Sequence, residues 1–128
     1  KIDFISVLNE KDNKKKISQI LHRLIIIEGI DRQKISIVSA TSLERSSLRG
    51  LDKIGNFEIK NSEYLNGNLV TYDTVFRFKG LENDIIILTD IDETTNKNEI
   101  MYVSTSRARL LLIVLSNQTV INNLKKYV

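Results

Sequence analysis

Two short runs of almost uninterrupted apolar residues set the strongest limit on how this chain folds. Residues 84–89 read DIIILT, and residues 110–116 read LLLIVLS. A strand with one face in water alternates apolar and polar residues, whereas a strand buried on both faces is apolar throughout. Such strands occur in parallel sheets that are covered by helices on both sides. The two runs therefore predict an α/β domain built around a mainly parallel sheet.

The rest of the chain alternates between strand and helix patterns. After the capping residue Asn9, apolar residues recur at the spacing of one buried helix face, and Gly29 is a stop signal for that helix. Further strands are expected at 2–8, 34–40, 57–59 and 68–74, and further helices at 42–51, 99–108 and 119–127. This order is typical of a three-layer α/β/α fold, in which ligands bind beyond the carboxyl ends of the strands.

Composition limits the classes of protein to which this chain can belong. The 128 residues suit one compact domain, 1–128, and we expect it to be a fragment of a longer protein. With no cysteine and one histidine, disulfides and thiolate metal sites are excluded. No apolar run approaches the ~20 residues that cross a bilayer, so we expect a cytoplasmic protein without a membrane partner. The net charge of +3 permits an anionic partner without requiring one.

Signals for nucleotide hydrolysis are incomplete. Gly50 and Gly55 have the glycine spacing of a phosphate loop, but Asn56 and Phe57 follow where that loop needs Lys and then Ser or Thr. The acids at 90–93 imitate a magnesium-binding strand end. Without a phosphate loop we interpret them as a polar exit loop. The chain therefore lacks a complete hydrolytic apparatus.

Two segments are nevertheless unusual. Residues 74–88 read TVFRFKGLENDIIIL, where a lysine, a glycine that allows close backbone approach and an acid suited to a sugar hydroxyl precede a buried strand. Residues 101–109 read MYVSTSRAR, a helix that ends in two arginines before the next buried strand. Either segment alone has an ordinary explanation; for example, arginines complement a helix C-terminus. Their pairing in this order is much more specific.

As a pair, T-V-F-R-F-K-G-L-E-N-D-I-I-I-L and Y-V-S-T-S-R-A-R resemble the fifth and sixth motifs of the UvrD/Rep-type superfamily 1 helicases. The similarity covers residues 35–116 and implies the second, C-terminal RecA-like domain of that family. It implies an ATP-dependent helicase or translocase on single-stranded DNA, or on RNA. ATP with Mg²⁺ would bind between this domain and an N-terminal RecA-like domain of the same protein.

The resemblance assigns roles to residues of both segments. Arg107 matches the arginine finger on the γ-phosphate, Glu82 the acid near the nucleotide ribose, and Gly80 the close backbone approach to the nucleotide. DNA contacts are expected in the first segment, where Phe76 replaces the histidine that is usual in the family. The DNA-binding set is Thr74, Phe76, Arg77 and Lys79.

Two departures from the family leave alternatives open. Ala40 stands where the fourth motif normally carries an arginine, so either Arg45 or Arg49 substitutes for it or the protein uses one arginine. The large accessory domain that the family inserts between the fourth and fifth motifs is missing. Ala40 favours a second hypothesis, a non-catalytic nucleic-acid or protein-binding module derived from a helicase domain. A third is an unrelated nucleotide-binding α/β domain. The isolated chain is expected to lack ATPase activity.

Overall fold

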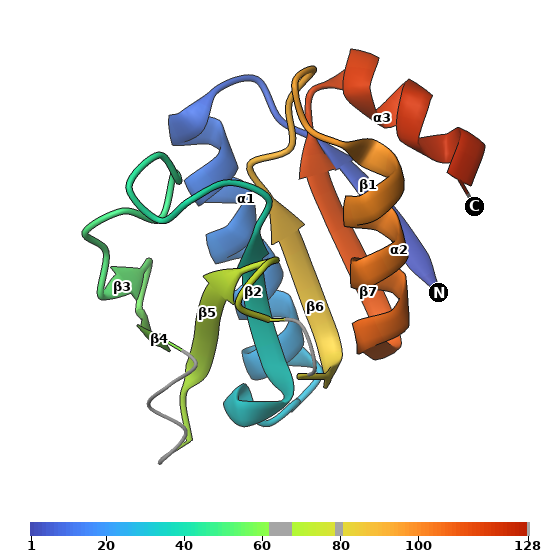
Figure 1. The fold of residues 1–128 in the computed structure, drawn as a ribbon. Helices are drawn as coiled ribbons and strands as arrows, with labels where there is room; N and C mark the ends of the chain where they lie inside the picture. Colours follow the sequence, from blue (N-terminus) through green and yellow to red (C-terminus); the bar gives the residue numbers. More distant parts are fainter. Residues whose placement is uncertain (62–67, 79–80, 128) are drawn as a thin grey trace.

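The computed structural model describes residues 1–61, 68–78 and 81–127. Within them a seven-stranded sheet has the order β1-β7-β6-β2-β5-β4-β3, and every pair is parallel except the antiparallel pair β3 and β4 (Figure 1). The strands are β1 (Ile2–Ser6), β2 (Ile35–Ser39), β3 (Lys53–Ile54), β4 (Phe57–Asn61), β5 (Val70–Thr74), β6 (Asn83–Thr89) and β7 (Ala108–Ser116). The expected mainly parallel sheet is confirmed.

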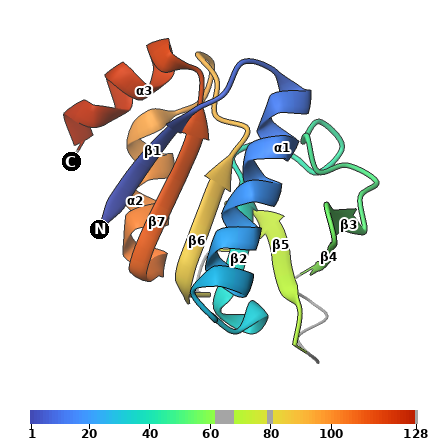
Figure 2. The same cartoon turned by 180° about the vertical axis from the view of Figure 1, so that it is seen from behind.

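Helices cover both faces of the sheet, which gives three layers. Helix α1 (Glu10–Leu21) lies on one face, while α2 (Lys97–Arg107) and α3 (Gln118–Leu124) lie on the other (Figures 1 and 2). Side chains of β6 alternate between two cores. Ile87 packs with the α1 core, and Ile86 and Leu88 pack with the core under α2 and α3. Both faces of this strand are therefore buried, which explains its continuous apolar sequence and confirms the RecA-like α/β fold.

Helix α1 has a side-chain cap at its start and a glycine stop at its end. The Asn9 carboxamide oxygen accepts a hydrogen bond from the backbone N–H of Asp12 at 2.8 Å, as an N-cap should. Beyond Leu21 the helix widens into a π-helix, His22–Ile27. Gly29 then adopts φ +71°, and the N–H of Ile30 returns to the carbonyl of Leu24. The predicted stop at Gly29 is confirmed.

The prediction of a helix at 42–51 is wrong. That segment forms successive tight turns, in which the N–H of Arg45 reaches the carbonyl of Ser42 and the N–H of Arg49 reaches that of Ser46. Serine side chains and a carboxylate from another loop take up the local hydrogen-bonding groups, which competes with helix formation. The antiparallel hairpin of β3 and β4 follows, and Gly55 makes its turn at φ +60°.

The other boundaries differ by a few residues. The helix expected at 99–108 ends at Arg107, so Arg109 belongs to β7. The closing helix passes into a 3-10 turn, Lys125–Tyr127. Among the residues that the structure describes, no helix is both long and apolar enough to span a bilayer.

Candidate functional site

The residues singled out by the two motifs lie at opposite edges of the sheet. Glu82 directly precedes β6 and Arg107 directly precedes β7, so both lie at the amino edge. Thr74 ends β5, and Phe76 follows it at the carboxyl edge. The seven residues of β6 separate the two edges by roughly 20 Å. Lys79 and Gly80 lie outside the described residues.

This division departs from the expectation that ligands gather at the carboxyl ends of the strands. The amino-edge residues come from the chain entering β6 and β7, whereas the carboxyl-edge residues come from loops that leave the strands. Sequence order does not show this division, because Thr74 and Glu82 belong to one short segment that turns back from one edge to the other.

At the amino edge, strand pairing puts Glu82 and Arg107 at adjacent backbone positions. Asn83 and Ala108 are partners in the β6–β7 register, and each of the two motif residues comes one position earlier. Helix α2 holds Arg107 in place through the buried side chains of Ile100 and Met101. The Nε of Arg107 is buried and has no hydrogen-bond partner among the residues that the structure describes. A buried donor without a partner costs free energy unless a ligand supplies an acceptor.

Arg109 has a different environment. Its Nε donates to the Oδ1 of Asp84 at 2.8 Å, and its Nη1 lies 3.3 Å from the Oε1 of Glu82. The hydrogen bond to Asp84 is the main cause that raises the pKa of Arg109. Arg109 is therefore paired at the edge of the strand. This pairing also means that Arg109 contacts Glu82, one of the two motif residues of the amino edge.

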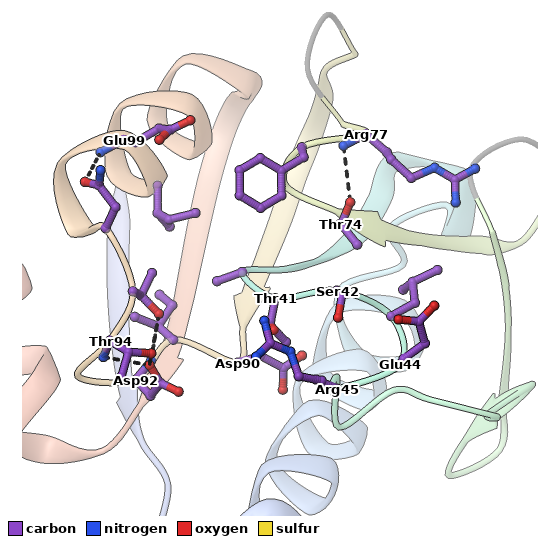
Figure 3. Close-up of a pocket in the computed structure, with 17 residues that line it drawn as sticks. Thr41, Ser42, Glu44, Arg45, Thr74, Arg77, Asp90, Asp92, Thr94 and Glu99 are labelled. Atoms are coloured by element: carbon purple, nitrogen blue, oxygen red, sulfur yellow. Dashed lines mark hydrogen bonds between the residues drawn. The ribbon is translucent and has the colours of Figure 1, made fainter.

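At the carboxyl edge, a cavity of about 810 Å³ opens between three loops (Figure 3). The turn after β5 contributes Thr74, Phe76 and Arg77, and the other two walls are the loops after β2 and β6. All three described residues of the expected DNA-binding set therefore line one cavity. Sequence analysis placed them together, and the structure adds the other two walls.

The three residues differ in what they can offer a ligand. Phe76 is 54% exposed, so its ring is available for stacking. Thr74 is buried, and its Oγ1 accepts a hydrogen bond from the backbone N–H of Arg77 at 3.2 Å, which shapes the turn. The Arg77 guanidinium lies 3.7 Å from Asp73 and stays half exposed. Phe76 and Arg77 are thus the exposed side chains of this turn.

Asp90 organises the opposite wall of the cavity, a role that sequence analysis missed. Its carboxylate accepts hydrogen bonds from the hydroxyls of Ser39 at 2.6 Å and Ser46 at 2.5 Å, and from the N–H of Ser47 at 3.1 Å. Its backbone has φ +64°, a left-handed conformation that is uncommon outside glycine. Two separate signals for this role are present in the sequence. Residues 39–47 are rich in serine, and the predicted strand at 84–89 is followed by an acid.

The interpretation of residues 90–93 as a polar exit loop agrees with these contacts. The hydroxyl of Thr94 donates to Asp92 at 2.6 Å, and this hydrogen bond is the first cause that lowers the pKa of Asp92. Among the described residues, no three His, Cys, Asp or Glu side chains are grouped as a metal site would need.

The position of Ala40 bears on one of the open alternatives. Ala40, Arg45 and Arg49 all lie at the carboxyl edge, where Ala40 and Arg45 line the cavity and Arg49 pairs with Glu10 at 2.7 Å. The length of the sheet separates them from Arg107. This separation favours the alternative in which the protein uses one arginine at the phosphate.

Comparison with known proteins identifies the fold. No family model matches the chain, and no curated protein is significantly similar to it. Several solved structures are similar, among them the crystal structure of the C-terminal domain of a possible DNA helicase from Lactobacillus plantarum WCFS1. That match has a TM-score of 0.66 at 18% identity and covers 91% of this chain and 72% of the other. The similarity is one of fold.

Proposed function

We propose that this chain is the C-terminal RecA-like motor domain of an ATP-dependent superfamily 1 helicase or translocase of the UvrD/Rep type, acting on single-stranded DNA. The observation that carries the proposal is the adjacent placement of Glu82 and Arg107 at the amino edge, with the Nε of Arg107 buried and unpartnered among the described residues. The two residues come from two motifs that are well separated in sequence. A neighbour of the same fold that is described as part of a possible DNA helicase supports the same conclusion.

In this proposal ATP is the substrate, and it binds with Mg²⁺ between this domain and an N-terminal RecA-like domain of the same protein. Arg107 contacts the γ-phosphate, Glu82 contacts the ribose, and Gly80 allows the close approach. The unpaired donor at Arg107 fits an anionic group. A guanidinium fixed by a packed helix stabilises the charge that develops on the transferred phosphoryl group, an effect that reaches ~10³–10⁵ in rate for arginine fingers.

The single strand is proposed to lie in the carboxyl-edge cavity. The exposed ring of Phe76 stacks against a base, while Arg77 and Lys79 contact phosphates. Contacts of this kind tolerate any sequence, because every base has a face on which an aromatic ring can stack. ATP-driven closing and reopening against the N-terminal domain would then move the strand past Phe76.

The competing function is a non-catalytic binding module. It drew its support from Ala40, but Ala40 lines the cavity at the carboxyl edge and not the amino edge where Arg107 lies. The lack of an arginine at position 40 therefore bears on nucleic-acid binding and leaves the proposed phosphate contact intact.

The deciding experiment is Arg107→Ala in the full-length protein. We expect kcat for ATP hydrolysis to fall by orders of magnitude while ATP affinity changes much less, because the contact is made mainly in the transition state. Arg107→Lys should recover only part of the rate, since lysine lacks the planar fork of donors. A full-length wild-type protein that binds DNA without hydrolysing ATP would favour the binding module.

A further inference from the structure

The carboxyl-edge cavity continues beyond the residues of the proposed DNA contact. A second hollow of about 350 Å³ shares Arg45, Asp90, Ile91 and Asp92 with the first. A third, of about 460 Å³, shares Asn9, Glu10 and Arg49 with the second and adds Lys11 and Lys14 of α1. The three hollows therefore lie in a row, and we call this row the edge channel. It extends from residues at the start of α2 to residues at the start of α1.

Charge along the edge channel is uneven. The α1 end of the channel is lined by three cations, Lys11, Lys14 and Arg49, and by one acid, Glu10. The Arg49 guanidinium already pairs with Glu10 at 2.7 Å. Among the described residues, neither Lys11 nor Lys14 has a carboxylate within 4.0 Å. Two cations therefore stay unneutralised beside the channel.

Apart from Glu10, the acids of the channel lie in its first cavity or in the part that the first two hollows share. Asp90 is occupied by its three hydrogen bonds from the Ser39–Ser47 segment, and Asp92 by those from Thr94. Glu44 and Glu99 line the first cavity only. An anionic chain that enters beside Phe76 would therefore be drawn toward α1, where the cations outnumber the acids.

The middle of the channel offers a different kind of surface. Leu8 lies two residues beyond the end of β1. It lines the second hollow, and its side chain is 87% exposed. Its backbone N–H is fixed by the carboxylate of Asp12 at 2.8 Å, so the side chain is held out by a capped turn. Asn9 and Asn13 of the same hollow are polar. An apolar side chain between polar walls suits a nucleobase that lies over a phosphate path.

We propose that the single-stranded nucleic acid does not end at Phe76 but continues through the edge channel to Lys11 and Lys14, whose ammonium groups bind its phosphates. This inference rests on the proposed function and extends its binding surface to α1. Charge on the phosphate backbone is the recognised feature, so the sugar is not specified.

The test compares two double variants of the full-length protein that remove the same charge from the same helix. Lys11→Ala/Lys14→Ala removes the two channel lysines, and Lys15→Ala/Lys16→Ala removes two that line none of the three hollows. Binding of fluorescent oligo-dT and oligo-rU would be measured as a function of salt. Losing two phosphate contacts should make the slope of log K against log [salt] shallower by about 1.4, or 0.7 for each contact.

We expect the Lys11/Lys14 pair to weaken binding and reduce the slope, and the Lys15/Lys16 pair to change both much less. Equal changes from the two pairs would mean general attraction to a basic helix and would overturn the edge channel alone. Binding that depends on Phe76 but not on Lys11 or Lys14 would do the same while leaving the proposed function standing. If the wild-type protein binds neither oligonucleotide, both proposals fail.

Discussion

Two arginines only two positions apart have different surroundings, and this difference can be tested residue by residue. Arg109 is bound to Asp84 and Glu82 at the surface, whereas the Nε of Arg107 is buried with no partner in the part of the chain that the structure describes. We predict that Arg109→Ala in the full-length protein changes kcat far less than Arg107→Ala does. Because Arg109 contacts Glu82, its loss should act mainly on the KM for ATP. Steady-state ATPase assays on both variants would measure this difference.

The assays on the Arg107→Ala and Arg109→Ala variants can also contradict this assignment. If both substitutions reduce kcat equally, or if Arg109→Ala reduces it more, the finger has been assigned to the wrong arginine. Thermal melts of the two variants separate a loss of catalysis from a loss of folding.

Phe76 and Phe78 form a natural pair for testing nucleic-acid binding. Phe76 is 54% exposed in the cavity, while Phe78 is 4% exposed and belongs to the core. We predict that Phe76→Ala weakens binding of single-stranded DNA by about 1–3 kcal/mol, the range for one stacked base, with little change in Tm. Phe78→Ala should instead lower stability by about 3–5 kcal/mol.

Fluorescence titration with an oligonucleotide and thermal melts would measure both effects. Unchanged DNA binding by a folded Phe76→Ala variant would remove the aromatic contact from the proposal. Burial of Phe76 in the core cannot explain such a result, because its ring is exposed.

At the scale of elements, the loop after β2 depends on a residue at the end of β6. Asp90 holds that loop through three hydrogen bonds while its own backbone sits at φ +64°. We predict that Asp90→Ala costs about 2–4 kcal/mol of stability, because three donors lose a charged acceptor. Asp90→Gly loses the same contacts but relieves the backbone, so it should be more stable than the alanine variant by about 1 kcal/mol.

Urea unfolding of both variants would test this, with Asp92→Ala as a control in the neighbouring exposed turn. If glycine proves as destabilising as alanine, the positive φ carries no strain of its own. If neither variant is destabilised, Asp90 does not hold the loop.

The elements that depend on burial were predictable from sequence, and those that depend on a distant partner were not. The runs at 84–89 and 110–116 predicted β6 and β7 because burial on both faces demands apolar residues throughout. The turns at 42–51 were mistaken for a helix because the acceptor that fixes them, Asp90, is far away in the sequence. The short strand β3 carries one buried residue, Ile54, which is too little pattern to detect.

The candidate sites were likewise predictable from sequence only in part. The motif pair led to Glu82, Arg107, Thr74 and Phe76 by resemblance, but sequence order could not show that they lie at two opposite edges. The parallel register of β6 and β7 gives Glu82 and Arg107 adjacent backbone positions, which sequence order does not show. The walls that Asp90 and Arg45 add to the carboxyl-edge cavity come from loops that carried no motif.

At the scale of the whole molecule, one strand connects the two proposed sites. β6 begins beside Glu82 at the amino edge and ends beside Asp90 at the carboxyl edge. Its residues are buried on both faces, so the strand is rigidly held between the two cores. A shift of the amino edge against another domain would therefore be transmitted to the cavity wall as a movement of the whole sheet, since packed interiors do not deform continuously.

The same arrangement predicts what the 128-residue chain can do by itself. Glu82 is exposed at the amino edge, and the Arg107 Nε has no acceptor there. The glycines that imitate a phosphate loop lie instead in a tight turn and in the β3–β4 hairpin, with φ +70° at Gly50 and +60° at Gly55. We predict that the purified chain has no ATPase activity. Under the proposed function, adding an N-terminal RecA-like domain from the same protein should give turnover.

A coupled phosphate-release assay would measure this activity, with Arg107→Ala purified in parallel as the control. Turnover shared equally by both preparations comes from a contaminant, because a substitution in the proposed finger cannot leave genuine hydrolysis intact. Turnover by the wild-type chain that Arg107→Ala abolishes would mean that residues 1–128 hold the triphosphate unaided. That result would contradict a site divided between two domains, while it would keep Arg107 at the centre of the chemistry.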